Sequence, residues 1–263
     1  MSERDGYAPG VPCWIDTWQA DADAAVAFYV GLFGWEVEDT MPPDVPGKHF
    51  MCTLRGRDIA AVASRPEAAP AVSSWGTYVW VESAEETAAK AVDAGGDVIM
   101  HPFESLDGGR ITVIGDPAGA AIGAWQPGTH KGAQLVNEPG AWSMSLLSTP
   151  DTEGALSFYR AVFGWTTEAF GSDFTMFRLP GFMGGEPQQP VPRDVVAVMT
   201  AADGQANWSV DFWTKDADAT AETAKQLGGS VVAGPFDTPV GRTAVLADPE
   251  GAVFSVSTVA AAT

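Results

Sequence analysis

The segment AFYVGLFGW at residues 27–35 decides how this chain is organised, because it returns as SFYRAVFGW at residues 157–165, 130 positions later. Both copies keep the pair Phe-Tyr and the triplet Phe-Gly-Trp at the same spacing. A long match at a fixed offset indicates an internal duplication, which sets the architecture of the whole fold.

Further matches between the two halves follow in the same order, with an offset that drifts only from 130 to 133. The matched pairs are WGTYVWV (75–81) with WSVDFWT (208–214), GGDV (95–98) with GGSV (228–231), GR (109–110) with GR (241–242), and DPAGAA (116–121) with DPEGAV (248–253). Two copies of one module therefore fill the chain. We expect a ligand site to lie between symmetry-related strands.

Each copy reads as strand, helix, several strands, with a second helix between the later strands. Residues 11–18 are rich in β-formers, Asp21 is placed to cap the next helix, and Gly34 is placed to end it. We expect three aromatic residues in each first helix to line its inner face: Phe28, Tyr29 and Phe33, and their counterparts Phe158, Tyr159 and Phe163.

These signals divide the chain into a first module at 8–127, a linker at 128–140 and a second module at 141–259. The linker is polar and punctuated by Gly and Pro. The second module carries an insert at 180–193, rich in Gly, Pro and Gln, that is expected either to be functional, as a cover over a pocket, or to be merely mobile. The predicted class is α+β, with two tandem, pseudo-symmetric modules.

The charge balance excludes one class of partner. Lys and Arg number 14 against 34 Asp and Glu, which gives a formal net charge of −20. Binding to a phosphate backbone needs clustered cations, so we expect no nucleic-acid partner. The acidic excess serves solubility in a salt-rich cytoplasm or attracts a cationic ligand.

Cysteine usage and hydropathy indicate where the protein works. Cys13 and Cys52 are the only cysteines, and the first residues lack an apolar signal segment. Although 46% of residues are hydrophobic, the sequence contains no run of 18 apolar residues, the length that a membrane-spanning helix needs. We expect a cytoplasmic protein with no membrane partner, either a monomer formed as an internal pseudo-dimer or a weak homodimer.

The helix motif AVAFY…LFGW and the turn Asp-Pro-x-Gly resemble the vicinal oxygen chelate superfamily, the group of glyoxalases, bleomycin-resistance proteins and extradiol dioxygenases. The resemblance covers nearly the whole chain. It is strongest for two-module actinobacterial proteins labelled hydroxylase or glyoxalase-like. It implies modules of βαβββ type whose mixed sheets curl into cups.

The resemblance also implies where metal ligands would stand in each cup. The first-strand positions hold Trp14 and Met144, and the last-strand positions hold Gly123 and Ser255. The middle-strand positions of the dioxygenases fall at Gly76 and Ser209. None of the six is a carboxylate or an imidazole, the usual hard or borderline ligands. The spacing of His49, His101 and His130 suggests no metal site either. We therefore expect no metal and no cofactor.

Strand alternation identifies the side chains that share the inner faces. Two of them, Asp16 and Asp211, are carboxylates, which are candidate general bases or anchors for a cation. Pairing with Arg110 and Arg242 is the structural alternative for these two. The candidate ligand-binding residues are Trp14, Trp18, Tyr78, Trp80, Trp125, Trp142, Met144, Trp213 and Ser255. Aromatic side chains in these positions either fill the sheet interiors or line a pocket.

Three functions fit this pattern. The first is a metal-independent protein that binds a small aromatic or cationic molecule in an aromatic, acidic cup. The second is an enzyme of lyase, hydroxylase or dioxygenase-like type that uses a carboxylate base or an unusually placed metal. The third is an interaction protein whose cups are filled by side chains. The sequence leaves open whether the protein is an enzyme.

Overall fold

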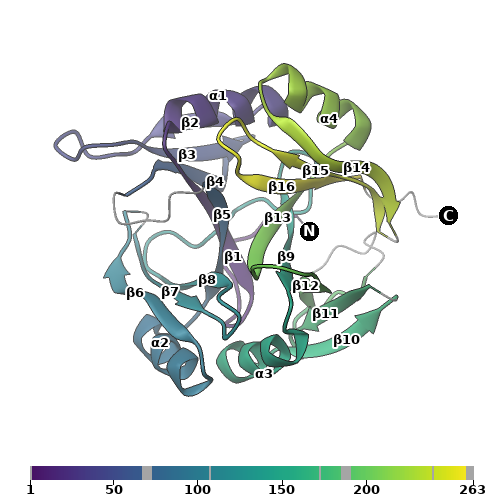
Figure 1. Cartoon of the computed structure of the whole chain (residues 1–263). Coiled ribbons are helices and arrows are strands. Elements are labelled where there is room, and N and C mark those ends of the chain that lie inside the picture. The colour runs from purple at the N-terminus through teal and green to yellow at the C-terminus, as the bar shows by residue number, and fades with distance from the viewer. Residues whose placement is uncertain are drawn as a thin grey trace.

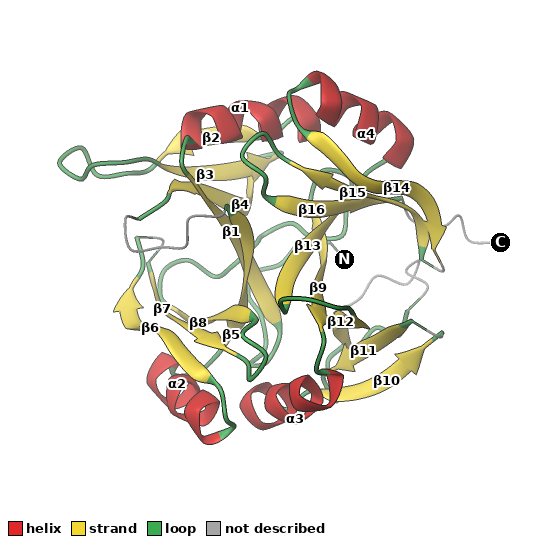
Figure 2. Cartoon of the chain, viewed as in Figure 1, coloured by secondary structure: helices red, strands yellow, loops and turns green. Residues whose placement is uncertain are grey.

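The part of the chain that the structure describes folds into two similar eight-stranded mixed sheets flanked by four helices (Figures 1 and 2). The computed structural model describes residues 2–66, 73–106, 108–171, 173–184, 191–238 and 240–258. The predicted end of the second module at 259 and residues 185–190 of the 180–193 insert lie outside this part. Within it, none of the helices combines the length and the apolar character needed to span a membrane.

The first half of the chain contributes β1 (Pro12–Gln19), α1 (Ala22–Phe33), β2 (Glu36–Asp39), β3 (His49–Leu54), β4 (Arg57–Ser64), β5 (Ser74–Trp80), α2 (Ala84–Asp93), β6 (Asp97–Glu104), β7 (Gly109–Gly115) and β8 (Ala121–Pro127). The second half contributes β9 (Trp142–Thr149), α3 (Thr152–Phe163), β10 (Thr166–Phe170), β11 (Phe174–Arg178), β12 (Val195–Ala201), β13 (Asn207–Trp213), α4 (Ala217–Gln226), β14 (Ser230–Thr238), β15 (Gly241–Ala247) and β16 (Val253–Ser257). The predicted α+β class and duplication are confirmed.

Each sheet is built from two βαβββ units that meet at its centre. The first sheet has the order β2-β3-β4-β1-β5-β8-β7-β6, and the second has β10-β11-β12-β9-β13-β16-β15-β14. The central strands β1 and β5 are antiparallel, whereas β1 with β4 and β5 with β8 are parallel. The same pairing holds for β9 and β13. Each sheet therefore presents a central strip of four strands, on which a site can be built.

The duplicated segment forms the first helix of each module as its end signals predict. The Asp21 side chain accepts a hydrogen bond from the Ala24 amide at 3.0 Å, which satisfies one of the open amides of the first turn. Gly34 closes the helix with φ of 73°, in the left-handed region that glycine adopts without a steric cost. Asp151 and Gly164 do the same for α3.

The two hydrophobic cores lie between the modules rather than within them. One core joins residues of β1, α1, β3 and β4 to residues of β13, α4, β15 and β16. The other joins residues of β5, β7 and β8 to residues of β9, α3, β11 and β12. In Figure 1, α1 accordingly lies beside α4, and α2 beside α3. Each module thus completes the core of the other.

A pair of buried hydrogen-bonded chains connects the modules. The Tyr29 hydroxyl donates to Asp248 at 2.9 Å and accepts from the Trp75 indole at 2.9 Å. In the symmetry-related chain, the Tyr159 hydroxyl donates to Asp116 at 3.0 Å and accepts from Trp208 at 2.8 Å. The repeated Tyr, Trp and Asp of the sequence motifs are therefore the residues of the interface between modules.

The repeated Gly-Gly pairs belong to the same interface. A Cβ at Gly229 would come within 2.8 Å of the Phe28 ring, and a Cβ at Gly96 within 2.5 Å of the Phe158 ring. Neither distance allows a side chain without a shift of the neighbour. Phe28 and Phe158 are buried, as predicted, but the surface on which they pack is the opposite module.

We predict that Phe28→Ala and Phe158→Ala each lower the free energy of unfolding by about 3–5 kcal/mol, because each leaves a cavity at the interface between modules. Both side chains are at most 2% exposed. Chemical denaturation at equilibrium measures the effect. A loss below about 1 kcal/mol would contradict this assignment.

Candidate functional site

Three neighbouring strands place one residue each at the same level of each cup. In the first sheet Trp14 faces Tyr78 across β1 and β5, and Tyr78 faces Gly123 across β5 and β8. The equivalent row in the second sheet is Met144, Asp211 and Ser255. The two modules therefore place very different chemistry at one backbone position.

The first cup is filled by aromatic rings. Trp14 and Trp125 are each only 1% exposed, and the ring of His130 from the linker packs edge-on against both, at 4.5 and 5.6 Å between centroids. The room for these rings comes from glycine, since a Cβ at Gly109 would lie 2.5 Å from the Trp125 ring and one at Gly123 would overlap the Tyr78 ring.

Asp16 lies at the half-exposed end of the first cup, where it accepts a hydrogen bond from the Tyr78 hydroxyl at 2.9 Å. Arg110, the partner that the sequence suggested for Asp16, forms ion pairs with Glu85 and Glu104 instead, at 2.6 and 2.8 Å. Arg242, the partner that the sequence suggested for Asp211, forms ion pairs with Asp218 and Asp237, at 2.5 and 3.2 Å. Both arginines thus tie sheet to helix outside the cups.

Asp211 is the centre of a buried polar cluster in the second cup. Its carboxylate accepts hydrogen bonds from the hydroxyls of Ser143 at 2.6 Å, Ser255 at 2.6 Å and Ser257 at 2.7 Å. The residue is 6% exposed, and burial raises the pKa of this carboxyl, while the three serine hydrogen bonds oppose the rise. The site thus holds a carboxyl whose pKa lies above its ordinary value because of burial.

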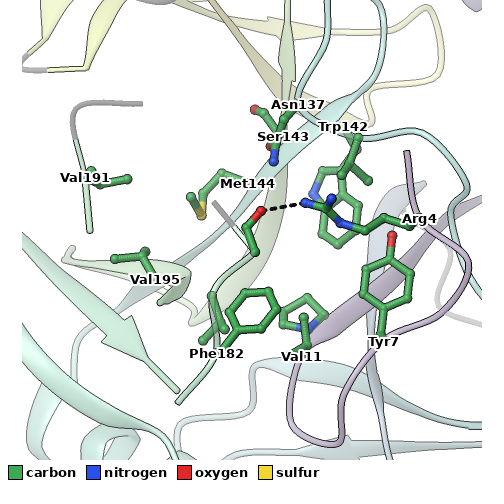
Figure 3. A pocket seen from close by; sticks show the side chains of 14 residues that line it. Arg4, Tyr7, Val11, Asn137, Trp142, Ser143, Met144, Phe182, Val191 and Val195 are labelled. Atoms are coloured by element: carbon green, nitrogen blue, oxygen red, sulfur yellow. Dashed lines mark hydrogen bonds between the residues drawn. The ribbon is translucent and has the colours of Figure 1, made fainter. Parts of the chain in front are cut away.

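A cavity of about 60 Å³ lies beside this cluster at the mouth of the second cup (Figure 3). Its inner wall includes Trp142, Ser143 and Met144 at the start of β9, so the hydroxyl of Ser143 stands between the cavity and Asp211. The remaining lining residues are Arg4, Tyr7, Val11, Pro12, Val136, Asn137, Phe182, Gly184, Val191, Val195 and Val196.

Residues 2–7, named here the N-terminal strap, cover this cavity. The Arg4 amide donates to Gln134 O at 2.9 Å, and the Val136 amide donates to Ser2 O at 3.0 Å. The Arg4 guanidinium reaches Gly184 O at 2.6 Å, which is the dashed contact in Figure 3. The described residues of the 180–193 insert therefore form one side of the cavity and meet the strap there.

The donor sets of the cups do not fit the metal that the fold family implies. The row in the first cup offers an indole, a phenol and a glycine, which has no side chain to bind a metal. The second offers a thioether, one carboxylate and a hydroxyl, and that carboxylate already accepts three hydrogen bonds. Across the described ranges, no cluster of three or more His, Cys, Asp or Glu side chains could hold an ion.

The candidate binding residues from the sequence fall into three groups. Trp142, Met144 and Ser255 gather in the second cup near Asp211, while Trp14, Tyr78 and Trp125 pack together in the first. Trp18, Trp80 and Trp213 are half-buried. Their roles in binding remain predictions. The sequence did not identify His130, Ser143 and Arg4 as residues of the two cups. Regular alternation along β9 places Ser143 on the outer face, but a bulge interrupts the strand register at this residue.

Comparisons with known proteins agree with this architecture. Residues 14–123 match the family described as the glyoxalase/bleomycin resistance protein/dioxygenase superfamily, and residues 144–257 match one described as a glyoxalase-like domain. The chain is 41% identical to a Mycobacterium tuberculosis protein named "Putative glyoxylase CFP32", over 97% of both chains. It is 35% identical to a Streptomyces protein named "Anthracycline biosynthesis protein DauV", over 95% of this chain and 94% of that one.

Solved structures share the fold at low sequence identity. A Mn(II)-bound glyoxalase from Novosphingobium aromaticivorans superposes with a TM-score of 0.63 at 15% identity, covering 95% of this chain and 82% of that one. The 2,3-dioxygenase LapB from Pseudomonas sp. KL28 gives 0.64 at 15% identity, with 96% and 93% covered. The chain belongs to the glyoxalase/bleomycin resistance protein/dioxygenase superfamily, also called vicinal oxygen chelate.

The raised pKa of Asp211 predicts how stability depends on pH. Below the ordinary carboxyl pKa of about 3.9 the residue is protonated in both states. As the pH rises above that value the unfolded chain ionises first, so the folded state loses stability until the pH passes the raised pKa. The wild type should therefore lose stability relative to Asp211→Asn across this window. Denaturation of both proteins at a series of pH values measures the difference, and a difference independent of pH would contradict the prediction.

Proposed function

We propose that the second cup binds a small aromatic molecule and that it does so without a metal. The observation that carries the proposal is the contrast between the cups: the first is filled by indole, phenol and imidazole rings, whereas the second keeps a cavity beside a buried carboxylate. Apolar walls with a few converging polar groups are typical of small-molecule sites.

The chemistry of the cavity favours a flat ligand. Trp142, Met144 and Phe182 offer an indole, a polarisable thioether and a phenyl ring as contact surfaces. The likeness to two Streptomyces proteins named for anthracycline biosynthesis, at 35% and 36% identity, supports a fused-ring aromatic compound as the ligand class. The net charge of −20 favours a ligand that also carries a cationic group.

Entry of such a ligand requires the strap to move. The cavity of about 60 Å³ has room for a few water molecules, whereas sites for drug-sized ligands measure about 300–1,000 Å³. The strap is attached at the cavity by two backbone hydrogen bonds and by the contact of Arg4 with Gly184. We infer that these contacts open when a multi-ring ligand binds.

We also propose that the protein works in the cytoplasm and as a monomer. Both cysteines are buried thiols without a disulfide, which suits a reducing cytoplasm. Each hydrophobic core is completed within the chain by residues of the other module, so we propose a monomer. Size-exclusion chromatography with light scattering distinguishes a monomer from a weak dimer.

The duplication supplies a test of the binding site. Met144→Trp copies into the second cup the residue that fills the first, where Trp14 stands in the same place of the row. We expect this variant to fold and to bind an anthracycline at least about tenfold more weakly, a change of about 1.4 kcal/mol. Titration by tryptophan fluorescence or calorimetry measures the affinity.

Val92→Trp is the matched control, because Val92 is 55% exposed on α2, outside the residues that line the cavity. It should bind like the wild type. Affinity for the cationic anthracycline should also fall as salt rises, since screening shortens the attraction. Unchanged binding by Met144→Trp, or no binding by the wild type, would remove the proposal.

A specific observation favours a second candidate, an enzyme that moves a proton. Ser143 lines the cavity and donates to Asp211, whose pKa is raised, so the pair could pass a proton between ligand and carboxylate. For this candidate we expect the protein to speed deuterium exchange at carbon next to a carbonyl of the bound ligand, followed by NMR. Asp211→Asn should lose about 10²-fold or more, and exchange at the buffer rate with wild-type protein would eliminate the enzyme.

A further inference from the structure

The indole of Trp142 has a hydrogen-bonding capacity that the described protein does not use. Trp142 is 5% exposed and lines the cavity, and its Nε1 is buried without a hydrogen-bond partner in the described residues. A buried N–H that lacks an acceptor costs free energy, and buried indoles usually find one. The Nε1 atom itself is covered in this closed arrangement, so a ligand acceptor reaches this unused donor once the strap has moved.

Other indoles of this chain show the usual arrangement. Trp35 donates to Gly140 O at 2.7 Å, and Trp165 donates to Gly10 O at 2.6 Å. Trp14 and Trp125 also lack an acceptor among the described residues, but their rings are covered by the ring of His130 in the filled cup. Trp142 differs because its ring borders open space (Figure 3).

The polar side chains around this space are those of Arg4, Tyr7, Asn137 and Ser143, and each of them has a partner within the protein. The guanidinium of Arg4 enters the cavity wall on the side of the strap, and it carries only N–H groups. The Ser143 proton is already given to Asp211, so the carboxylate is screened from the cavity by that hydroxyl. The apolar side chains of Phe182 and Val195 complete this surface. Among the described residues that line the cavity, the Trp142 N–H is the buried side-chain group left without a partner, and such a donor needs a ligand atom with a lone pair.

Resting on the function proposed above, the geometry points to a ligand that presents a carbonyl oxygen to the Trp142 N–H. The ligand class is therefore a quinone or aryl ketone rather than an aromatic hydrocarbon or a simple aromatic amine. The indole N–H donates a hydrogen bond directly to the ligand oxygen, and no metal ion takes part in this contact.

Two probes of the same shape test the inference. Both carry a trimethylammonium tail on three fused rings, one built on 9,10-anthraquinone and the other on anthracene. The wild type should bind the quinone about five- to tenfold more tightly, the ratio that one buried hydrogen bond supplies. In Trp142→Phe, which keeps an aromatic ring but lacks the N–H, the quinone should bind no more tightly than the hydrocarbon.

Trp75→Phe is the matched control, because it removes a buried indole N–H that bonds Tyr29 in the core between the modules. It should keep the preference for the quinone. A second measurement needs no variant of the site: in wild-type protein labelled with ¹⁵N-tryptophan, one indole N–H resonance should shift downfield with the quinone and not with the hydrocarbon. This result stands even if Trp142→Phe fails to fold.

The outcomes separate the two proposals. If both probes bind the wild type equally and no indole resonance responds to the carbonyl, the second cup is a binding site but the oxygen contact is wrong. If the preference persists in Trp142→Phe, another donor holds the oxygen and the inference is overturned. If neither probe binds, the proposed function and this inference fall together.

Discussion

The structure depends on a buried tyrosine hydroxyl that bridges an indole N–H of its own module and a carboxylate of the other, at Tyr29 and again at Tyr159. A buried carboxylate is costly unless hydrogen-bonded, and burial raises the pKa of Asp248. Separating the modules would remove this tyrosine donor and expose both cores, since each core contains strands of both halves. The fold is therefore one cooperative unit although its sequence is a tandem repeat.

This constraint explains where the two copies agree and where they differ. Central strands, the first helix of each module and the turns near them form the interface between modules, and there the copies keep the same Trp, Tyr, Phe, Gly and Asp. The inner faces of the cups do not contact the other module in this way, so their residues need not be the same in the two copies. Trp14, Tyr78 and Gly123 in one cup correspond to Met144, Asp211 and Ser255 in the other. One cup contributes packing, and the other retains space and a titratable group.

The second cup combines a buried carboxyl, held by three serine hydroxyls, with apolar side chains along the neighbouring cavity. Three serine hydroxyls satisfy Asp211, so its charge does not need a metal or an arginine for stabilisation. The position is central on β13, flanked by strands on both sides, and this holds the carboxyl in a fixed place relative to Ser143 and the cavity. A rigid strand is a better support for an oriented contact than a loop.

The sequence by itself determined the duplication, the α+β class, the superfamily and the caps of α1 and α3, because these follow from local periodicity and from motifs repeated at one offset. It also placed Asp211 and Ser255 on one inner face, since strand alternation is a local property. Only the tertiary structure decided that Phe28 and Tyr29 pack on the opposite module, that a linker histidine fills the first cup, and that Arg4 meets Gly184 over the second. These contacts join residues far apart in the chain, and the pairing of one repeat with another leaves no signal within either repeat. The bulge that turns Ser143 toward Asp211 is likewise a product of strand pairing, which alternation along a single strand does not reveal.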